Sequence, residues 1–302
     1  MSTTRRSFLK SSALLLTGAT LLSETAFSKA RINEIVSVQL YGVREDMKKD
    51  PLGSLTKLFD MGYRNLEHAN YVDRKFYGFN ALEFKKILDD LGMKMPSGHT
   101  VLAPKHWDNK TNDFTDEWKY TIEDAATLGQ KFVVSPYMDQ NVRTDYTQFM
   151  DFMEVFNRCG ELCKTYDMLY GYHNHAFEFS EKLEGKTLFD LIMDNTDADK
   201  VIVQLDMGNM YQAGAKAIDI LKKYPGRFQT IHVKDVMRNS EGKFESTILG
   251  DGLVGSKEVL KLSRKTGGTN LYVIEQEAYQ DKTPMECMEE NLIIMKKWGF
   301  KA

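Results

Sequence analysis

Ionisable residues stand at the ends of four successive apolar segments, each about the length of a β-strand. In chain order they are His173, Asp206, His232 and Glu275. If the four segments are parallel strands of one barrel, their carboxyl ends meet at the same mouth and these side chains converge. Two imidazoles and two carboxylates suit Mn²⁺, Co²⁺ or Zn²⁺ better than Mg²⁺ or Ca²⁺. Any one of them alone is more often a structural polar residue, but together they predict a site for one divalent metal ion.

The elements that must position these residues alternate along residues 31–302. Apolar β-type runs predict strands at 35–43, 64–69, 94–100, 132–137, 169–175, 201–207, 228–234 and 271–277. Amphipathic periodicity predicts helices at 52–61, 81–91, 116–128, 146–166, 187–194, 217–224, 257–266 and 285–298. Because no linker divides the series, the sequence predicts one α/β domain over 31–302, a single (β/α)8 TIM barrel.

Further polar residues fall at the carboxyl ends of the predicted strands, where the βα loops of a barrel build its active site. Five of the six histidines stand there. The candidates for catalysis are Glu275, His175, His99 and Lys234, and the candidates for substrate contact are Glu67, His68, Tyr137, Trp107 and Asn209. Structural roles are the alternative: a salt bridge of Lys234 with Asp206 or Glu277, orientation of the histidines by Glu67 and His68, and core packing of the aromatic residues.

The first thirty residues have the features of an export signal. Arg5 and Arg6 precede an apolar stretch at 13–22, and small residues follow around Ala26 and Ala30, where a signal peptidase could cut. The apolar stretch is too short for a permanent membrane span. Residues 1–30 therefore predict export by the twin-arginine route to a periplasmic or secreted location, without stable membrane insertion.

The overall charge limits the partners. The chain has 302 residues, of which 27% are charged, and a formal net charge of -3. A nucleic-acid surface needs a concentrated basic face, so we expect a small molecule and no nucleic acid. Whether copies of the chain form a homo-oligomer is left open by the sequence.

Four segments carry a family resemblance. They are Tyr-His-Asn-His-Ala-Phe-Glu-Phe at 172–179, Gln-Leu-Asp-Met-Gly-Asn at 204–209, His-Val-Lys-Asp at 232–235 and Val-Ile-Glu-Gln-Glu at 273–277. The chain thus resembles the sugar phosphate isomerase/epimerase family of xylose isomerase-like barrels, and an exported subgroup with a Tyr-His-Asn-His motif. The resemblance implies one divalent metal held by a Glu, an Asp, a His and a second Glu. Asp206, His232 and Glu275 match the last three, whereas His173 stands where many members have the first Glu and Asn209 where a His often follows the Asp.

The resemblance also implies a reaction, which is proton abstraction next to a carbonyl. We therefore expect a metal-dependent isomerase or epimerase of a carbohydrate, a keto-sugar that carries no phosphate because phosphorylated sugars are normally cytoplasmic. Related epimerases exchange the proton between two glutamates, whereas this chain has Glu275 on one side and His173 or His175 on the other. That asymmetry supports an alternative, a lyase that expels the aglycone of a 3-keto-glycoside by β-elimination. A non-catalytic sugar-binding barrel is a third reading.

Overall fold

Eight parallel strands close into a barrel, as predicted. The computed structural model describes residues 34–266 and 268–301, so the predicted export signal at 1–30 lies outside the described residues. The barrel strands are β1 (Ile35–Gln39), β2 (Asn65–His68), β5 (Lys94–His99), β8 (Phe132–Ser135), β9 (Leu169–His173), β12 (Val201–Asp206), β13 (Thr230–Val233) and β16 (Leu271–Ile274). Because β1 pairs with both β2 and β16, the sheet has no free edge and the predicted (β/α)8 fold is confirmed.

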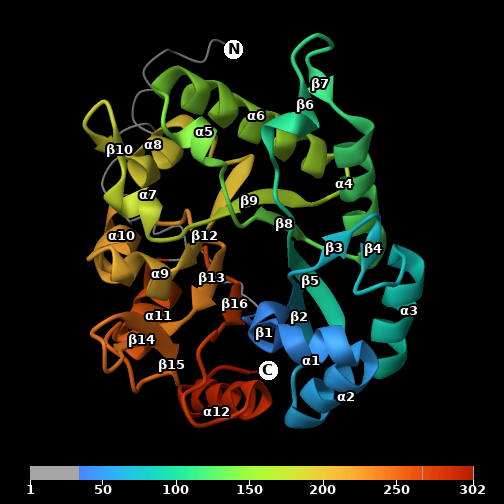
Figure 1. Ribbon diagram of the computed structural model, residues 1–302, viewed down its shortest axis with the longest axis vertical. Helices are drawn as coiled ribbons and strands as arrows, with labels where there is room; N and C mark the ends of the chain where they lie inside the picture. Colours follow the sequence, from blue (N-terminus) through green and yellow to red (C-terminus); the bar gives the residue numbers. More distant parts are fainter. Residues whose placement is uncertain (1–33, 267, 302) are drawn as a thin grey trace, which may run out of the picture. The chain divides into compact units, whose positions relative to one another are not determined.

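Helices surround the barrel (Figure 1). They are α2 (Pro51–Met61), α3 (Ala81–Leu91), α4 (Asp116–Leu128), α6 (Tyr146–Lys164), α8 (Leu188–Asn195), α10 (Ala217–Lys223), α11 (Ser256–Thr266) and α12 (Pro284–Lys297). Local signals fix their ends: α3 begins at a capping box between Asn80 and Glu83 and ends at Gly92, whose φ is 69°. In the described part of the chain, no helix is both long enough and apolar enough to span a membrane.

The strands are shorter than the sequence predicts. The predicted strand at 35–43 ends at Gln39, because the Gln39 side chain accepts the N–H of Tyr41 and starts a 3₁₀ turn, η1 (Leu40–Val43). The predicted strand at 201–207 ends at Asp206, which caps the short helix α9 (Met207–Gln212). Polar side chains thus turn the chain out of the sheet at the point where it must leave the barrel.

Short elements that the sequence did not predict fill the βα loops. They are α1 (Arg44–Lys49), η2 (Pro104–His106), α5 (Gln140–Arg143), α7 (Phe177–Ser180), and four small hairpins: β3 (Tyr71–Val72) with β4 (Lys75–Phe76), β6 (Trp107–Asp108) with β7 (Asp113–Phe114), β10 (Lys182–Leu183) with β11 (Lys186–Thr187), and β14 (Asp235–Arg238) with β15 (Phe244–Thr247). These loops follow the carboxyl ends of the strands, so they build the wall of the mouth.

The barrel interior has an apolar layer below and a polar layer above. A separate cluster of buried apolar residues fills the lower layer: Phe132, Val134, Ile202, Leu271 and Val273. Since alternate residues of a strand point to the same side, the strand of Ile202 also sends Gln204 and Asp206 inward. The strand of Leu271 and Val273 continues to Glu275 in the same way. The polar layer at the mouth therefore stands on a dry apolar floor.

Candidate metal centre and active site

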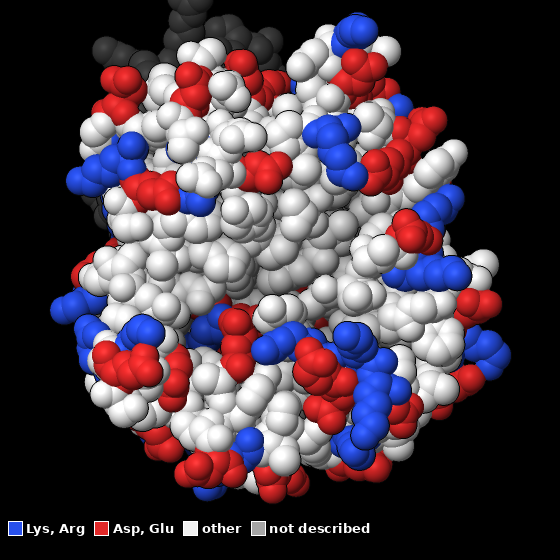
Figure 2. Space-filling model, viewed as in Figure 1, with Lys and Arg blue, Asp and Glu red and all other residues white. Residues whose placement is uncertain are grey.

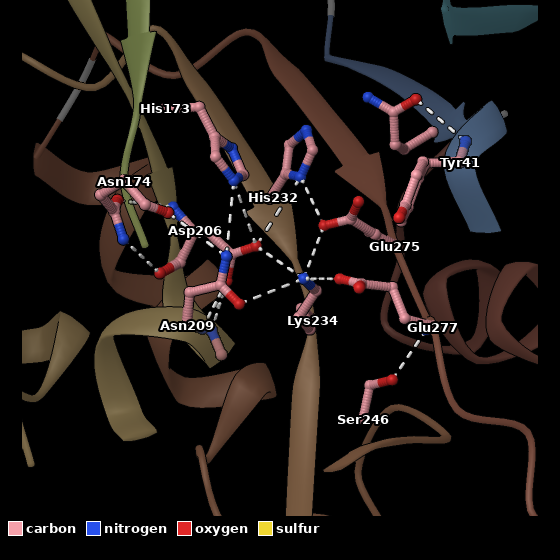
Figure 3. A network of polar contacts seen from close by, with 12 residues as sticks. Tyr41, His173, Asn174, Asp206, Asn209, His232, Lys234, Ser246, Glu275 and Glu277 are labelled. Carbon is pink, nitrogen blue, oxygen red and sulfur yellow. Dashed lines mark hydrogen bonds and ion pairs between the residues drawn. The ribbon is translucent and has the colours of Figure 1, made fainter. Parts of the chain in front are cut away.

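The four predicted metal ligands converge. One ligand atom from each of His173, Asp206, His232 and Glu275 lies within 4.8 Å of the others, and all four residues are buried. His173 ends β9, Asp206 ends β12, His232 lies in β13, and Glu275 follows β16 directly. Figure 3 shows the four side chains pointing toward one another. The convergence predicted from four separate strand ends is thus present.

One oxygen of Asp206 is left without a hydrogen-bond partner. Its Oδ1 accepts the N–H groups of Gly208 at 2.9 Å and Asn209 at 2.7 Å, whereas among the described residues Oδ2 accepts no hydrogen bond. Oδ2 lies 3.8 Å from His232 Nδ1 and 3.9 Å from His173 Nε2. Burial raises the pKa of Asp206 to about 6. The ion-pair partner of Oδ2 is Lys234 Nζ, at 3.3 Å. A buried carboxylate oxygen that accepts no hydrogen bond and lies between two imidazole nitrogens fits a bound metal ion.

His173 presents a lone pair to the same point. Its Nδ1 lies 3.0 Å from Gln204 Oε1, which can only accept, so Nδ1 carries the hydrogen and Nε2 has the lone pair. Nε2 has only a long contact of 3.5 Å with Asn209 Nδ2, which a metal ion at Nε2 would replace. Burial, followed by the neighbouring histidines, lowers the pKa of His173 well below its usual value. Gln204 also accepts from His99 Nε2 at 2.7 Å. Gln204 was not predicted as a site residue, although it stands two positions before Asp206 and shares its inward direction.

His232 is held between two carboxylates. Its Nδ1 lies 3.0 Å from Glu275 Oε2 and its Nε2 lies 2.5 Å from Glu67 Oε1. Burial opposes a charge on this ring, but Glu67 and Glu275 outweigh it and raise the pKa of His232 to about 10. With a metal ion at Nδ1, the Nε2–H would still donate to Glu67, the usual carboxylate–histidine–metal arrangement.

Glu67 lies beneath the cavity and not on its surface. It is fully buried, and its oxygens accept from Gln39 Nε2 at 2.7 Å, Ser97 Oγ at 2.5 Å and Gln204 Nε2 at 2.8 Å. Burial opposes its ionisation, but His99 and His232 hold the pKa of Glu67 well below its usual value. This placement matches the orienting role that the sequence left as the alternative to substrate contact.

The charges of this layer also fit a divalent cation. Glu67, Asp206 and Glu275 are buried carboxylates, and Lys234 is the buried ammonium beside them. If His232 is neutral, two negative charges are left over, which a divalent ion would neutralise. Since unbalanced buried charge is strongly unfavourable, the donor set and the charge point to the same occupant.

Lys234 forms both of the salt bridges that the sequence offered as alternatives, with Asp206 and with Glu277. Its Nζ lies 3.3 Å from Asp206 Oδ2 and 2.7 Å from Glu275 Oε2, and it also donates to Glu277 and to Asn209 Oδ1 (Figure 3). Burial would favour the neutral amine, but the carboxylates raise the pKa of Lys234 well above its usual value. Lys234 is therefore a fixed cation at the edge of the cavity.

A cavity of about 920 Å³ opens above these residues. Of the predicted catalytic and substrate residues, those that line it are His99, His175, Lys234, Glu275, Tyr137 and Asn209. The His175 side chain lines this cavity, and its buried Nδ1 has no hydrogen-bond partner among the described residues. Burial lowers the pKa of His175 to about 4, so its ring is neutral. Glu178 holds the backbone of this residue in place, because its Oε2 accepts the backbone N–H of His175 at 2.7 Å.

Besides Glu67, two predicted substrate residues do not line the cavity. His68 is buried against Phe76, and a Cβ at Gly98 would lie 1.9 Å from its Nε2, so His68 fills the space that a glycine leaves. Trp107 packs edge to face on Phe114 in its own hairpin, with ring centroids 4.9 Å apart. The outer wall of the cavity is formed instead by residues that the sequence did not single out for it, among them Tyr120 and Arg74.

Comparison with known proteins agrees with this fold. The model of the family described as "Xylose isomerase-like TIM barrel" matches residues 55–298. The crystal structure of a sugar phosphate isomerase/epimerase from Parabacteroides distasonis is 26% identical, has a TM-score of 0.75, and covers 91% of this chain and 98% of its own. The IOLI protein, crystallised with a zinc atom, has a TM-score of 0.68 over 87% of this chain and 97% of its own; at 14% identity it shows the fold alone.

A curated relative, the inosose dehydratase of Clostridium perfringens, is 24% identical over 159 residues, which are 47% of this chain. The match spans about half of that relative, 52% of its length. Since the family model covers most of the chain, including every barrel strand from the second to the eighth and the four candidate metal ligands, the assignment does not depend on this partial match. The chain belongs to the xylose isomerase-like TIM barrel family.

Proposed function

We propose that the protein is a metal-dependent isomerase or epimerase that removes the α-proton next to the carbonyl of a non-phosphorylated keto-sugar. The observation that carries the proposal is the convergence of His173, Asp206, His232 and Glu275 at the floor of an open cavity, around an Asp206 Oδ2 that accepts no hydrogen bond from the described residues. These residues would hold one Mn²⁺, Co²⁺ or Zn²⁺ ion, which as a Lewis acid polarises a carbonyl oxygen.

Two unlike groups can handle the proton. Glu275 follows β16 and His175 follows β9, and in the barrel order these strands are separated by β13 and β12, so the two side chains reach the cavity from different sides. His175 is neutral, with an unbonded nitrogen, and can accept a proton. Glu275 is bound to His232 and Lys234, which outweigh burial and hold its pKa well below its usual value. We therefore assign His175 as the base, with His99 as a second proton carrier and Lys234 as the stabiliser of the developing oxyanion.

The loop after β13 supports a substrate without phosphate. In many barrels, backbone N–H groups near this place bind a phosphate. Here the Asp235 carboxylate takes those donors: Oδ2 accepts from Gly250 N at 2.9 Å and Ser256 Oγ at 2.9 Å, and Oδ1 accepts from Val254 N at 3.1 Å. A carboxylate already bound there would repel a phosphate.

A second candidate reaction is β-elimination from the same enolate, by which a dehydratase or a 3-keto-glycoside lyase would expel a leaving group. The unlike pair of Glu275 and His175 favours it, because elimination needs one base and one acid and no exchange between matched groups. The curated relatives named inosose dehydratase lend it support. A non-catalytic sugar-binding barrel is the third outcome that the experiment below separates.

The test is to incubate the Mn²⁺- or Zn²⁺-loaded protein in D₂O with free keto-sugars and with 3-keto-glycosides, and to analyse the products by mass spectrometry and, after removal of the metal, by NMR. Deuterium beside the carbonyl with a rearranged sugar supports the isomerase or epimerase, and release of the aglycone supports the lyase. Bound metal without either result supports the binding barrel. Asp206→Asn should abolish any reaction, whereas Tyr146→Ala, on the outer helix α6, should leave it unchanged.

We also propose that residues 1–30 direct export to the periplasm or beyond, on the order of the charged, apolar and small residues described above. Replacing Arg5 and Arg6 together by lysine should retain the protein in the cytoplasm. Equal amounts of the wild-type and the double variant in the periplasmic fraction would refute this.

A further inference from the structure

We infer that the outer half of the cavity is a second subsite, which binds a neutral, ring-shaped unit attached to the keto-sugar. The substrate is then a glycoside with an apolar or aromatic-faced second unit, not a free monosaccharide. The identity of the first unit rests on the proposed function, whereas the second subsite depends on the wall of the cavity alone.

The cavity is larger than one sugar needs. Its volume of about 920 Å³ lies near the upper end of the roughly 300–1,000 Å³ typical of pockets for drug-sized ligands. This volume equals about thirty waters of ~30 Å³, whereas a single hexose has only about twelve non-hydrogen atoms. A ring that rests on His99, His173 and Glu275 at the floor therefore leaves the outer part unfilled.

Exposed apolar side chains gather in this outer part. Of the eleven large hydrophobic residues that are exposed in the described part of the chain, five line this cavity: Tyr41, Val72, Val101, Tyr120 and Tyr137. The space-filling view shows the same feature as an uncharged hollow across the middle of the face, with charged side chains around it (Figure 2). A concentration of exposed aromatic and apolar surface in a concave place is typical of a binding site, because it stacks well on the face of a ring.

The cations of the cavity wall are already paired. Arg74 binds Asp124 through two hydrogen bonds, at 2.9 Å from Nε and 2.7 Å from Nη2, and Lys105 Nζ lies 2.8 Å from Glu117. Lys234, the remaining Lys or Arg of the lining, is bound to the carboxylates at the floor. The exposed Asp73 carboxylate also faces the cavity. An anionic second unit would find no unpaired Lys or Arg in this wall, so the wall suits a neutral one.

The wall is also held in place before any ligand binds. The turn between β3 and β4 has positive φ at both central residues, 49° at Asp73 and 61° at Arg74, as in the tight type I′ turn of a two-residue hairpin. Arg74 then reaches to α4, where its guanidinium lies 4.4 Å from the ring centroid of Tyr120. Because the hairpin and the helix are fixed to each other, a ligand does not have to order them, which favours affinity.

The experiment measures binding, without turnover, by the metal-loaded protein. The probes are the methyl and phenyl glucosides and galactosides, in both anomers, together with cellobiose; they carry no keto group and so cannot enolise. We expect the phenyl glycoside of the preferred sugar to bind at least tenfold more tightly than its methyl glycoside in calorimetric titration. A similar gain in affinity for cellobiose would identify a second sugar as the natural second unit. A gain for the phenyl glycoside alone would identify an aromatic aglycone.

Variants of the wall residues test whether the gain in affinity for the phenyl glycoside arises from the wall of the cavity. Tyr120→Ala and, separately, Tyr137→Ala should reduce the affinity for the phenyl glycoside toward that for the methyl glycoside. Tyr146→Ala is the matched control, since Tyr146 is 39% exposed and Tyr137 is 40% exposed, but Tyr146 lies on α6 and not in the cavity. Circular dichroism and thermal unfolding show whether each variant is folded.

The outcomes separate this inference from the proposed reaction. If neither the phenyl glycosides nor cellobiose bind more tightly than the methyl glycosides, or if nothing binds, the second subsite is refuted even if deuterium exchange occurs with a free keto-sugar. If the phenyl glycoside gains affinity through Tyr120 and Tyr137 while no exchange is seen with any keto-substrate, the subsite stands and the proposed reaction fails.

Discussion

Replacing Glu67 by glutamine should weaken metal binding although Glu67 does not touch the predicted metal position. The substitution keeps the volume of the side chain but removes its charge. In the wild-type protein the Glu67 oxygens receive hydrogen bonds from Gln39, Ser97, Gln204 and His232. A glutamine amide must turn its NH₂ group toward one pair of these donors, and its neutral oxygen holds His232 more weakly than a carboxylate does.

The expected size of the effect follows from that one contact. A hydrogen bond to a charged group contributes about 1.5–3 kcal/mol, and loss of a carboxylate that orients a metal-binding histidine commonly lowers metal affinity about 10–100-fold. We expect the Kd of Glu67→Gln for Zn²⁺ or Mn²⁺ to rise by about that factor. The pKa of His232 should fall at the same time, because Glu67 is the first of the charges that raise it.

The assay is titration of the metal-free protein against a competing chelator at pH 7.5, with circular dichroism to show that the variant is folded. Glu277→Gln is the matched control: its side chain is 42% exposed, and it binds Lys234 but none of the four metal candidates. A Kd within twofold of wild type for folded Glu67→Gln, or an equal loss in both variants, would show that Glu67 does not support the metal through His232.

Three further predictions concern stability. A divalent ion at about 100 times its Kd should stabilise the protein by about 2.7 kcal/mol, seen as a higher Tm, and Asp206→Asn should lose this gain; an equal gain in the variant would place the ion elsewhere. Burial raises the pKa of Glu178 to about 7, so its stabilising effect is complete below the unfolded value near 4.5 and is lost as the pH rises through 7, by roughly 3 kcal/mol. Glu178→Gln, whose amide can accept the His175 N–H and donate to Tyr172, should therefore be more stable than wild type at pH 8 and less dependent on pH, and an unchanged pH profile of urea unfolding would contradict this. Gly98→Ala should lower the stability by about 1–3 kcal/mol, because the new Cβ would lie 1.9 Å from His68 Nε2, and a Tm equal to that of wild type would show that the His68 ring moves freely.

The sequence was sufficient to predict the barrel and the convergence of the four candidate metal ligands, because both depend on local patterns. Alternation along each strand sets which residues point inward, and closure of the barrel brings the strand ends together. The same alternation places Gln204 inside the barrel, two residues before Asp206. The residue type alone, however, does not indicate which groups the Gln204 amide binds. Only the distances of its Oε1 to His99 and His173 reveal that it fixes the rings of both.

The wall of the cavity could not be predicted in the same way. The strands β3 and β4 have two residues each, too few for a periodic pattern, and they are held by the contact of Arg74 with Asp124, fifty residues away in the chain. Trp107 shows the opposite case: its position after the third barrel strand indicated the mouth, but Phe114 offered it a partner within its own hairpin. Contacts between distant segments decide such side chains, and a single sequence does not display them.

The apolar layer of Phe132, Val134, Ile202, Leu271 and Val273 has a consequence for proton traffic. These side chains fill the barrel below the histidines and carboxylates, whereas the cavity lies above them. If the proposed reaction takes place there, a ligand that fills the cavity would separate these groups from bulk water, and a proton taken from the substrate would stay close to the carbon that released it. The stereochemistry at that carbon would then depend on the bound ligand itself, because the ligand blocks the open end of the barrel.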